Sequence, residues 1–253
     1  MSRVPRMRQM WILAVTAGLW SPAVYADTIL LRDVRGVDAR AVTTELDASG
    51  NIVRQNIATD AQQAVPAQPF THATRVNAPL PGGTASALII QESIAGPFNF
   101  IGTGAAQLEP MINSSSITSA GSEAGSFYGV TFQLLEPYRY HYNTFVERLH
   151  PEGFPSFSET RLSDSTGGTL HHLELFETGG FLSLSRSGTL RPGVYTLEGN
   201  ARVFEFGGDV FGRAQYQVEL SLTPVPEPGS MLLVGTGLAA LVARTRKRRS
   251  TRA

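Results

Sequence analysis

The chain of 253 residues contains no cysteine. This absence excludes disulfide bonds, thiol catalysis, thiolate metal sites and a lipid anchor attached through cysteine. An exported protein of this size does not depend on disulfide bonds, because about two hundred residues bury enough surface to form a hydrophobic core.

The common signatures of catalytic and nucleotide-binding sites are also missing. The sequence has no Gly-x-Ser-x-Gly elbow, no His-Glu-x-x-His pair, no Walker loop and no dinucleotide fingerprint. It has no Asp-x-Asp-x-Asp calcium loop either. We therefore predict no catalytic residue, no metal and no cofactor, and we expect that the protein is not an enzyme. A pair of carboxylates brought together from distant strands is the alternative, and it would make the chain a secreted hydrolase.

Histidine is scarce, and its spacing does not indicate a metal site. The five histidines are His72, His141, His150, His171 and His172. Adjacent residues of a strand point to opposite faces, so His171 and His172 cannot easily hold one metal ion together. We interpret all five as surface or partly buried side chains.

Sustained helical periodicity is absent between residues 27 and 223. Short runs of alternating apolar and polar residues are separated there by Gly, Ser, Thr and Pro, which is typical of strands. The runs that predict strands are 39–46, 51–57, 85–92, 97–101, 126–135, 138–147, 170–176, 181–185, 193–201 and 215–222. Their number and spacing predict an all-β fold, a single antiparallel β-sandwich or jelly-roll-like domain over residues 27–223.

Three connections are also predicted from composition. Asp47-Ala48-Ser49-Gly50 lies between two strand candidates and predicts a hairpin turn. Residues 60–83 are rich in Ala, Gln and Pro and favour a long loop. Residues 113–125 are rich in Ser and Gly and favour a surface connection.

An aromatic run offers the clearest candidate binding residues. At strand spacing, Tyr138, Tyr140 and Tyr142 share one face. Tyrosines with a polar rim can stack on sugar rings, which gives a possible glycan strip. The favoured interpretation is that these tyrosines pack in the core of the sandwich, with their hydroxyl groups reaching its edge.

The N-terminal segment has the layout of a secretory signal peptide. Arg3, Arg6 and Arg8 precede an apolar stretch over residues 10–20, and Ser21-Pro22 ends it. Small side chains at Val24 and Ala26 predict cleavage between Ala26 and Asp27, so that residues 1–26 are removed. An uncleaved N-terminal anchor is the alternative.

The C-terminal segment combines three features. The linker 224–230 contains Val225, Pro226, Glu227 and Pro228, and its prolines favour extended backbone. Residues 231–243 are uncharged and apolar, which predicts a short hydrophobic helix. The basic tail 244–253 favours the cytoplasmic side of a membrane through Arg244, Arg246, Lys247, Arg248 and Arg249.

The apolar run is short for a membrane span. Residues 229–243 would rise roughly 22 Å as a helix, against about 30 Å of hydrocarbon in a bilayer. A terminal core helix and a permanent tail anchor are the two alternatives. A membrane segment that is recognised, held for a time and then removed fits the short length best.

Together these features resemble the PEP-CTERM proteins of Gram-negative bacteria. The resemblance rests on the signal peptide, on Val-Pro-Glu-Pro at 225–228, and on the apolar run and arginine cluster that follow. It covers about the last thirty residues and implies export by the secretion machinery and transient retention in the inner membrane. It further implies processing near residues 226–228 by an exosortase, a membrane-embedded protease, and delivery to the cell surface or the extracellular matrix.

The charge of the predicted mature domain limits the classes of partner that it can bind. Residues 27–226 contain 12 basic and 20 acidic side chains, although the whole chain has 21 of each. A net formal charge of −8 argues against nucleic acid as a partner. We therefore expect a non-catalytic envelope or matrix protein associated with exopolysaccharide. The alternatives are a carbohydrate-binding module and the secreted hydrolase.

Overall fold

The computed structural model describes residues 28–109, 111–112, 117–149, 156–176, 179–206 and 211–225, together with 236, 237 and 239. These residues form thirteen strands: β1 (Ile29–Leu46), β2 (Ile52–Gln63), β3 (Phe70–Leu80), β4 (Gly83–Ala95), β5 (Asn99–Leu108), β6 (Met111–Ile112), β7 (Ile117–Leu134), β8 (Tyr138–Leu149), β9 (Ser156–Asp164), β10 (Thr169–Phe176), β11 (Gly180–Leu190), β12 (Gly193–Phe206) and β13 (Gly212–Pro224). The predicted signal peptide and its cleavage point lie outside the described residues, as does His150.

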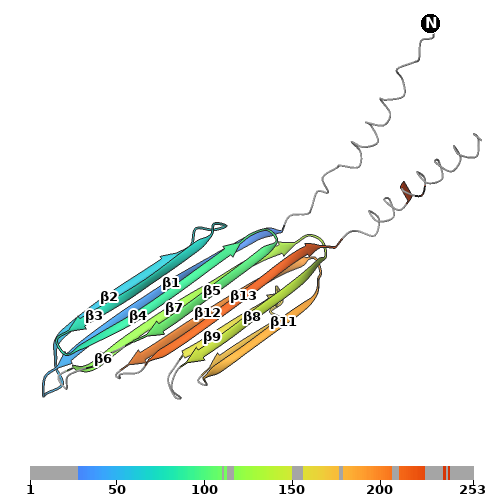
Figure 1. Cartoon of the computed structure of the whole chain (residues 1–253). Coiled ribbons are helices and arrows are strands. Elements are labelled where there is room, and N and C mark those ends of the chain that lie inside the picture. The colour runs from blue at the N-terminus through green and yellow to red at the C-terminus, as the bar shows by residue number, and fades with distance from the viewer. Residues whose placement is uncertain are drawn as a thin grey trace, which may run out of the picture.

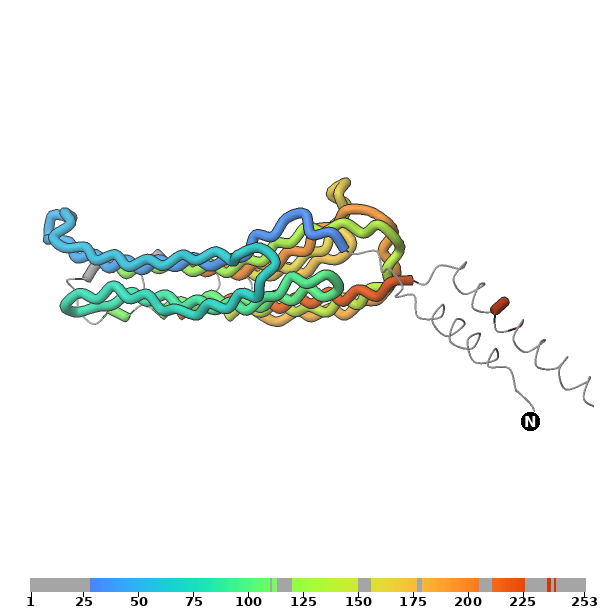
Figure 2. Tube along the Cα trace, turned by 90° about the horizontal axis from the view of Figure 1, so that it is seen from above, coloured from blue at the N-terminus to red at the C-terminus, as the bar shows by residue number. Residues whose placement is uncertain are grey.

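The strands make two antiparallel sheets that face each other, as the views in Figures 1 and 2 show. Within the described residues, one sheet has six strands in the order β10-β9-β12-β7-β1-β2. The other has seven, in the order β11-β8-β13-β5-β4-β3, with β6 paired to β4. The predicted all-β antiparallel sandwich is confirmed, and so is the hairpin at Asp47–Gly50, which joins β1 to β2.

The prediction of a long loop over residues 60–83 is wrong. Strand β2 continues to Gln63, and β3 occupies Phe70–Leu80. The loop was predicted partly because the segment is rich in proline. One of these prolines, Pro79, lies within β3 opposite Thr84, and β3 is at the edge of its sheet. An edge strand tolerates proline because the missing N–H can face away from the neighbouring strand.

The prediction of a surface connection over residues 113–125 is also wrong from Ile117 onward, and residues 113–116 lie outside the described residues. Strand β7 begins at Ile117 and is paired with β1 on one side and β12 on the other. Its small residues Ala120, Ser122 and Ala124 alternate inward and are buried between the sheets. These small side chains face the interior of the sandwich from a strand that has a neighbour on each side. They do not mark a loop.

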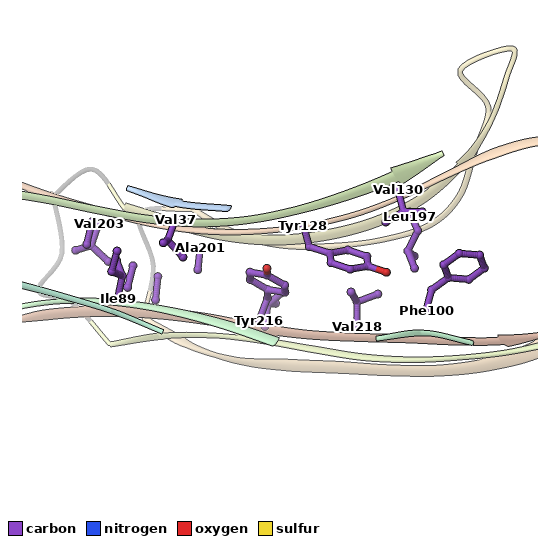
Figure 3. Packing of buried hydrophobic residues seen from close by; sticks show 14 of the residues in the cluster. Val37, Ile89, Phe100, Tyr128, Val130, Leu197, Ala201, Val203, Tyr216 and Val218 are labelled. Carbon is purple, nitrogen blue, oxygen red and sulfur yellow. The ribbon is translucent and has the colours of Figure 1, made fainter. Parts of the chain in front are cut away.

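Two tyrosines cross the core in opposite directions (Figure 3). Tyr128 of β7 lies against Gly102 of the other sheet, where an added Cβ would come within 2.7 Å of its ring. Tyr216 of β13 lies against Gly199 of the six-stranded sheet, at 2.4 Å from the position of an added Cβ. Each aromatic ring therefore occupies space that a glycine on the facing sheet leaves open.

Both ends of the folded body lie at the same pole of the sandwich (Figures 1 and 2). The first residue of β1, Ile29, pairs with Gln133 near the end of β7. The last residue of β13, Pro224, pairs with Tyr138 at the start of β8. Strand β1 has 18 residues and spans roughly 60 Å at about 3.3 Å per residue. The opposite pole therefore lies far from the point where the C-terminal tail leaves.

Candidate functional site

The junction between the body and the tail has no spacer. Strand β13 stays paired with β8 as far as Pro224 and Tyr138. The next backbone amide, that of Val225, donates a hydrogen bond of 3.1 Å to the carbonyl of Pro137. Pro226, Glu227 and Pro228 follow at once in the sequence but lie outside the described residues, as do Arg244, Arg246, Lys247, Arg248 and Arg249. Among the residues that the structure describes, no helix is long and apolar enough to span a membrane.

A hollow of about 280 Å³ opens on the outer face of the six-stranded sheet. We call it the Gly129 trough, because Gly129 lies in its floor and puts no side chain there. Gly129 pairs with Val34 on β1 and with Glu198 on β12, so the trough runs across three neighbouring strands. Strand β9 adds Glu159 and Arg161 to its lining.

The aromatic side chain of the trough is Phe127, two residues before Gly129 and on the same outer face. It pairs with Gly36 on β1 and with Asn200 on β12. An added Cβ at Gly36 would come within 2.8 Å of Phe127 Cζ. The ring of Phe127 therefore rests on the sheet over Gly36, and Phe127 as a whole is half-buried.

An ion pair forms the polar wall of the trough. Arg161 Nε and Nη2 donate hydrogen bonds of 2.8 and 2.6 Å to a single oxygen, Glu198 Oε2. These hydrogen bonds raise the pKa of the Arg161 guanidinium above its ordinary value. Both bonds end on Oε2, and among the described residues no hydrogen bond reaches the second carboxylate oxygen of Glu198.

Two further contacts involve polar side chains of the trough. The hydroxyl groups of Thr131 and Thr196 lie 3.2 Å apart on neighbouring strands. Glu159 Oε1 lies 3.2 Å from His172 Nε2. Both glutamates of the trough thus have a basic side chain beside them: Arg161 for Glu198 and His172 for Glu159.

The predicted tyrosine strip lies on the inner face of β8. Tyr138 and Tyr142 are fully buried, and Tyr140 is half-buried with its hydroxyl 2.8 Å from His171 Nε2. The rings of Tyr138 and Tyr142 lie in the core, as the favoured interpretation expected, but the Tyr142 hydroxyl is itself buried and does not reach the edge of the sandwich. Neither Tyr138 nor Tyr142 exposes a ring face on which a sugar could stack.

The adjacent histidines point to opposite faces, as their spacing indicates. His171 faces inward and its ring stacks on that of Tyr142, with 5.1 Å between centroids. His172 faces outward and contacts Glu159. Within the described residues, no group of three His, Cys, Asp or Glu side chains could hold a metal ion.

Comparison with known proteins identifies the tail. Residues 224–249 match the PEP-CTERM protein-sorting motif. The chain carries a PEP-CTERM tail. This confirms the resemblance drawn from the sequence and marks the chain as an exported protein that an exosortase processes at the membrane. The motif begins at Pro224, so its first two residues, Pro224 and Val225, are also the last that pair with the sandwich.

The chain is remotely similar to several solved structures, and no curated protein matches it. The enzymatically active domain of bacteriophage CBA120 tailspike protein 4 is 17% identical, with 53% of this chain and 19% of that chain covered and a TM-score of 0.24. The isomalto-dextranase of Arthrobacter globiformis T6, complexed with panose, is 13% identical, with 76% and 32% covered and a TM-score of 0.22. VP2 of infectious bursal disease virus is 11% identical, with 94% and 91% covered and a TM-score of 0.16.

These likenesses do not assign a function to the body. The chain spans about a fifth and about a third of the length of the first two structures. All three TM-scores are too low to support an inference from one protein to the other.

The trough was not predicted from the sequence, because its residues come from four strands that are far apart in the chain. The sequence does contain one pattern that relates to the trough. Alternation over residues 126–135 places Phe127, Gly129 and Thr131 on the face opposite Tyr128 and Val130. Which strands lie beside that face depends on the pairing order, and the sequence pattern does not contain it.

Proposed function

We propose that this protein is a non-catalytic component of the cell surface or extracellular matrix of a Gram-negative bacterium, associated with exopolysaccharide. The secretion machinery exports it through a signal peptide cleaved between Ala26 and Asp27. The tail then holds it in the inner membrane until an exosortase processes it near residues 226–228. The observation that carries this proposal is the sorting motif at 224–249, which begins at the last residue of β13.

Two properties of the body support a structural role. The mature region is acidic, with 12 basic and 20 acidic residues between 27 and 226, which favours solubility outside the cell. In the trough, Glu198 is bound to Arg161 and Glu159 contacts His172. Each glutamate of the trough is therefore held by a basic side chain of a neighbouring strand.

The test follows the fate of the chain in a host that has an exosortase. A tag inserted in the Asp47–Gly50 turn reports both precursor and processed forms. We expect a membrane-bound precursor that is converted to a shorter, released form. Deleting residues 231–253 should abolish the membrane-bound stage, and a strain without the exosortase should accumulate the precursor.

The matched control is a deletion of residues 250–253, which lie beyond the matched motif and leave the arginine cluster intact. It should be processed like the full chain. Equal release from strains with and without the exosortase would refute the sorting proposal. Recovery of the processed protein only in the periplasm, with none at the surface or in the matrix, would refute its destination.

A further inference from the structure

We propose that the Gly129 trough binds a sugar ring of an uncharged glycan. This inference rests on the proposed function, in which the protein is associated with exopolysaccharide. It names the surface that makes the contact. That surface differs from the tyrosine strip and lies on the other sheet.

The polar groups of the trough suit a ligand with many hydroxyl groups. Each hydroxyl both donates and accepts hydrogen bonds. The trough provides donors on Arg32 and Arg161, an acceptor on Glu198, and both kinds on Asn200. Because Arg161 binds only Oε2 of Glu198, the pair is fixed in position while the other oxygen stays open to a ligand.

The floor of the trough suits the apolar side of a sugar ring. The ring of Phe127 rests over Gly36, and its face carries the negative part of the aromatic quadrupole, which attracts weakly positive C–H groups. Beside it, Gly129 leaves a space without a side chain. A sugar ring has such C–H groups on its faces and hydroxyl groups around its rim, which matches an aromatic floor with polar walls.

The charges of the trough argue against other small ligands. Two arginines and two glutamates line it, Arg32 and Arg161 against Glu159 and Glu198, so its formal charge is balanced. A phosphate or sulfate group would gain no net electrostatic attraction there, because the two carboxylates offset the two guanidinium groups. An apolar ligand would remove the Arg161–Glu198 pair from water without replacing the lost hydrogen bonds, which costs free energy.

The chain supplies well-matched control positions on the other sheet. Arg75 Nη1 and Glu109 Oε2 are 2.6 Å apart, and their side chains are 45% and 36% exposed. Arg161 and Glu198 have the same distance, with exposures of 42% and 39%. For Phe127, the control is Phe145, which is also half-buried and outward-facing and whose ring packs at a tilt against that of Phe181.

The experiment measures glycan binding by the full chain, purified in detergent. An array of neutral, uronic-acid, sulfated and phosphorylated oligosaccharides identifies the class that is retained. Titration calorimetry with the best neutral oligosaccharide then gives the affinity. We expect Phe127→Ala and Glu198→Gln each to weaken binding about tenfold, in line with the loss of a hydrogen bond to a charged group for the latter. Phe145→Ala and Glu109→Gln should leave the affinity unchanged.

The outcomes separate this inference from the proposed function. No retained saccharide, retention only of sulfated or phosphorylated ones, or equal loss in the control variants would overturn the trough as a neutral-sugar site. If Phe127→Ala fails to fold, Glu198→Gln decides, since it keeps the shape of the side chain. Cleavage of the bound oligosaccharide would contradict the non-catalytic role and leave the binding site standing. Sorting is measured separately in cells, so its failure would not alter these affinities.

Discussion

The backbone amide of Val225 donates to the carbonyl of Pro137 at 3.1 Å, and this hydrogen bond fastens the chain immediately before Pro226. The sorting motif therefore starts on the surface of the folded sandwich. A protease acts on extended, accessible backbone, so the body limits how closely an exosortase can approach.

We expect a spacer at this junction to speed processing. Inserting Gly-Ser-Gly-Ser between Thr223 and Pro224 moves the whole matched motif, residues 224–249, away from the sandwich. It also releases Pro224 from its pairing with Tyr138 and Val225 from its hydrogen bond to Pro137. Pulse-chase labelling of the precursor should show a shorter half-life than for the unmodified chain. The same four residues inserted into the Asp47–Gly50 turn, at the far pole, are the control and should leave the half-life unchanged. A slower or equal rate with the spacer would show that the folded body does not hinder the protease.

A second prediction concerns the close approach of Tyr216 to Gly199. An added Cβ at Gly199 would come within 2.4 Å of the ring, and Tyr216 is buried with Gly104 on its other side. We expect Gly199→Ala to lower the free energy of unfolding by about 1–3 kcal/mol, the usual cost of overpacking a core. Urea denaturation measures it.

Gly193→Ala on the same strand is the matched control. Its added Cβ would make only ordinary contacts, at 3.7 Å or more from Tyr195. The free energy of unfolding should therefore change by less than about 0.5 kcal/mol. A similar loss in both variants would mean that β12 is sensitive to any side chain and that Tyr216 is not the cause.

The sequence predicts this fold well where the pattern of residues has one structural meaning, and poorly where it has two. Alternation correctly predicted strands at residues 126–135 and 215–222, because one buried face is enough to produce it. The segment 113–125 was misread because Ser and Gly serve both in loops and in the interior of a closely packed strand. The β7 strand is buried by neighbours on both sides, and its small residues reflect that packing.

The candidate site was predictable only in part. The sorting motif is contiguous and was recognised from its residues alone. The trough depends on four strands brought side by side, and the order β9-β12-β7-β1 is a long-range property. Phe127 and Gly129 could be placed on one face, but Arg161 and Glu198 could not be placed beside them.

A third prediction concerns a buried ion pair that is hydrogen-bonded to the segment between β2 and β3, which connects the two sheets. Arg35 and Asp33 side chains are 0% and 1% exposed, and Arg35 Nη2 donates to Asp33 Oδ2 at 2.7 Å and to the carbonyl of Gln68 at 2.7 Å. Asp33 also accepts from the amide of Ala67 at 2.8 Å. We expect Arg35→Gln to lower the free energy of unfolding by about 3–5 kcal/mol, because it leaves a buried carboxylate without its partner.

The control for Arg35→Gln is Arg54→Gln. Arg54 also pairs with a carboxylate, that of Glu45 at 3.8 Å, but its side chain is 60% exposed. Exposed pairs contribute little, so the loss should stay below about 1 kcal/mol. Equal losses in the two variants would contradict a special role for the buried pair.

The last prediction is a pH dependence at His171. Burial, and then the positive charge of Arg186, lower the pKa of His171 below its ordinary value of 6.5. The unfolded chain therefore takes up a proton near pH 6.5, while the folded chain takes it up only at a lower pH. Stability from this residue is complete above pH 6.5 and decreases as the pH falls from there toward the folded pKa. In His171→Gln, which keeps a polar group near the Tyr140 hydroxyl, unfolding free energies measured between pH 7 and pH 5 should fall less steeply. A folded-state pKa at or above 6.5 in an NMR titration of His171 would contradict this, since the proton would then stabilise the fold.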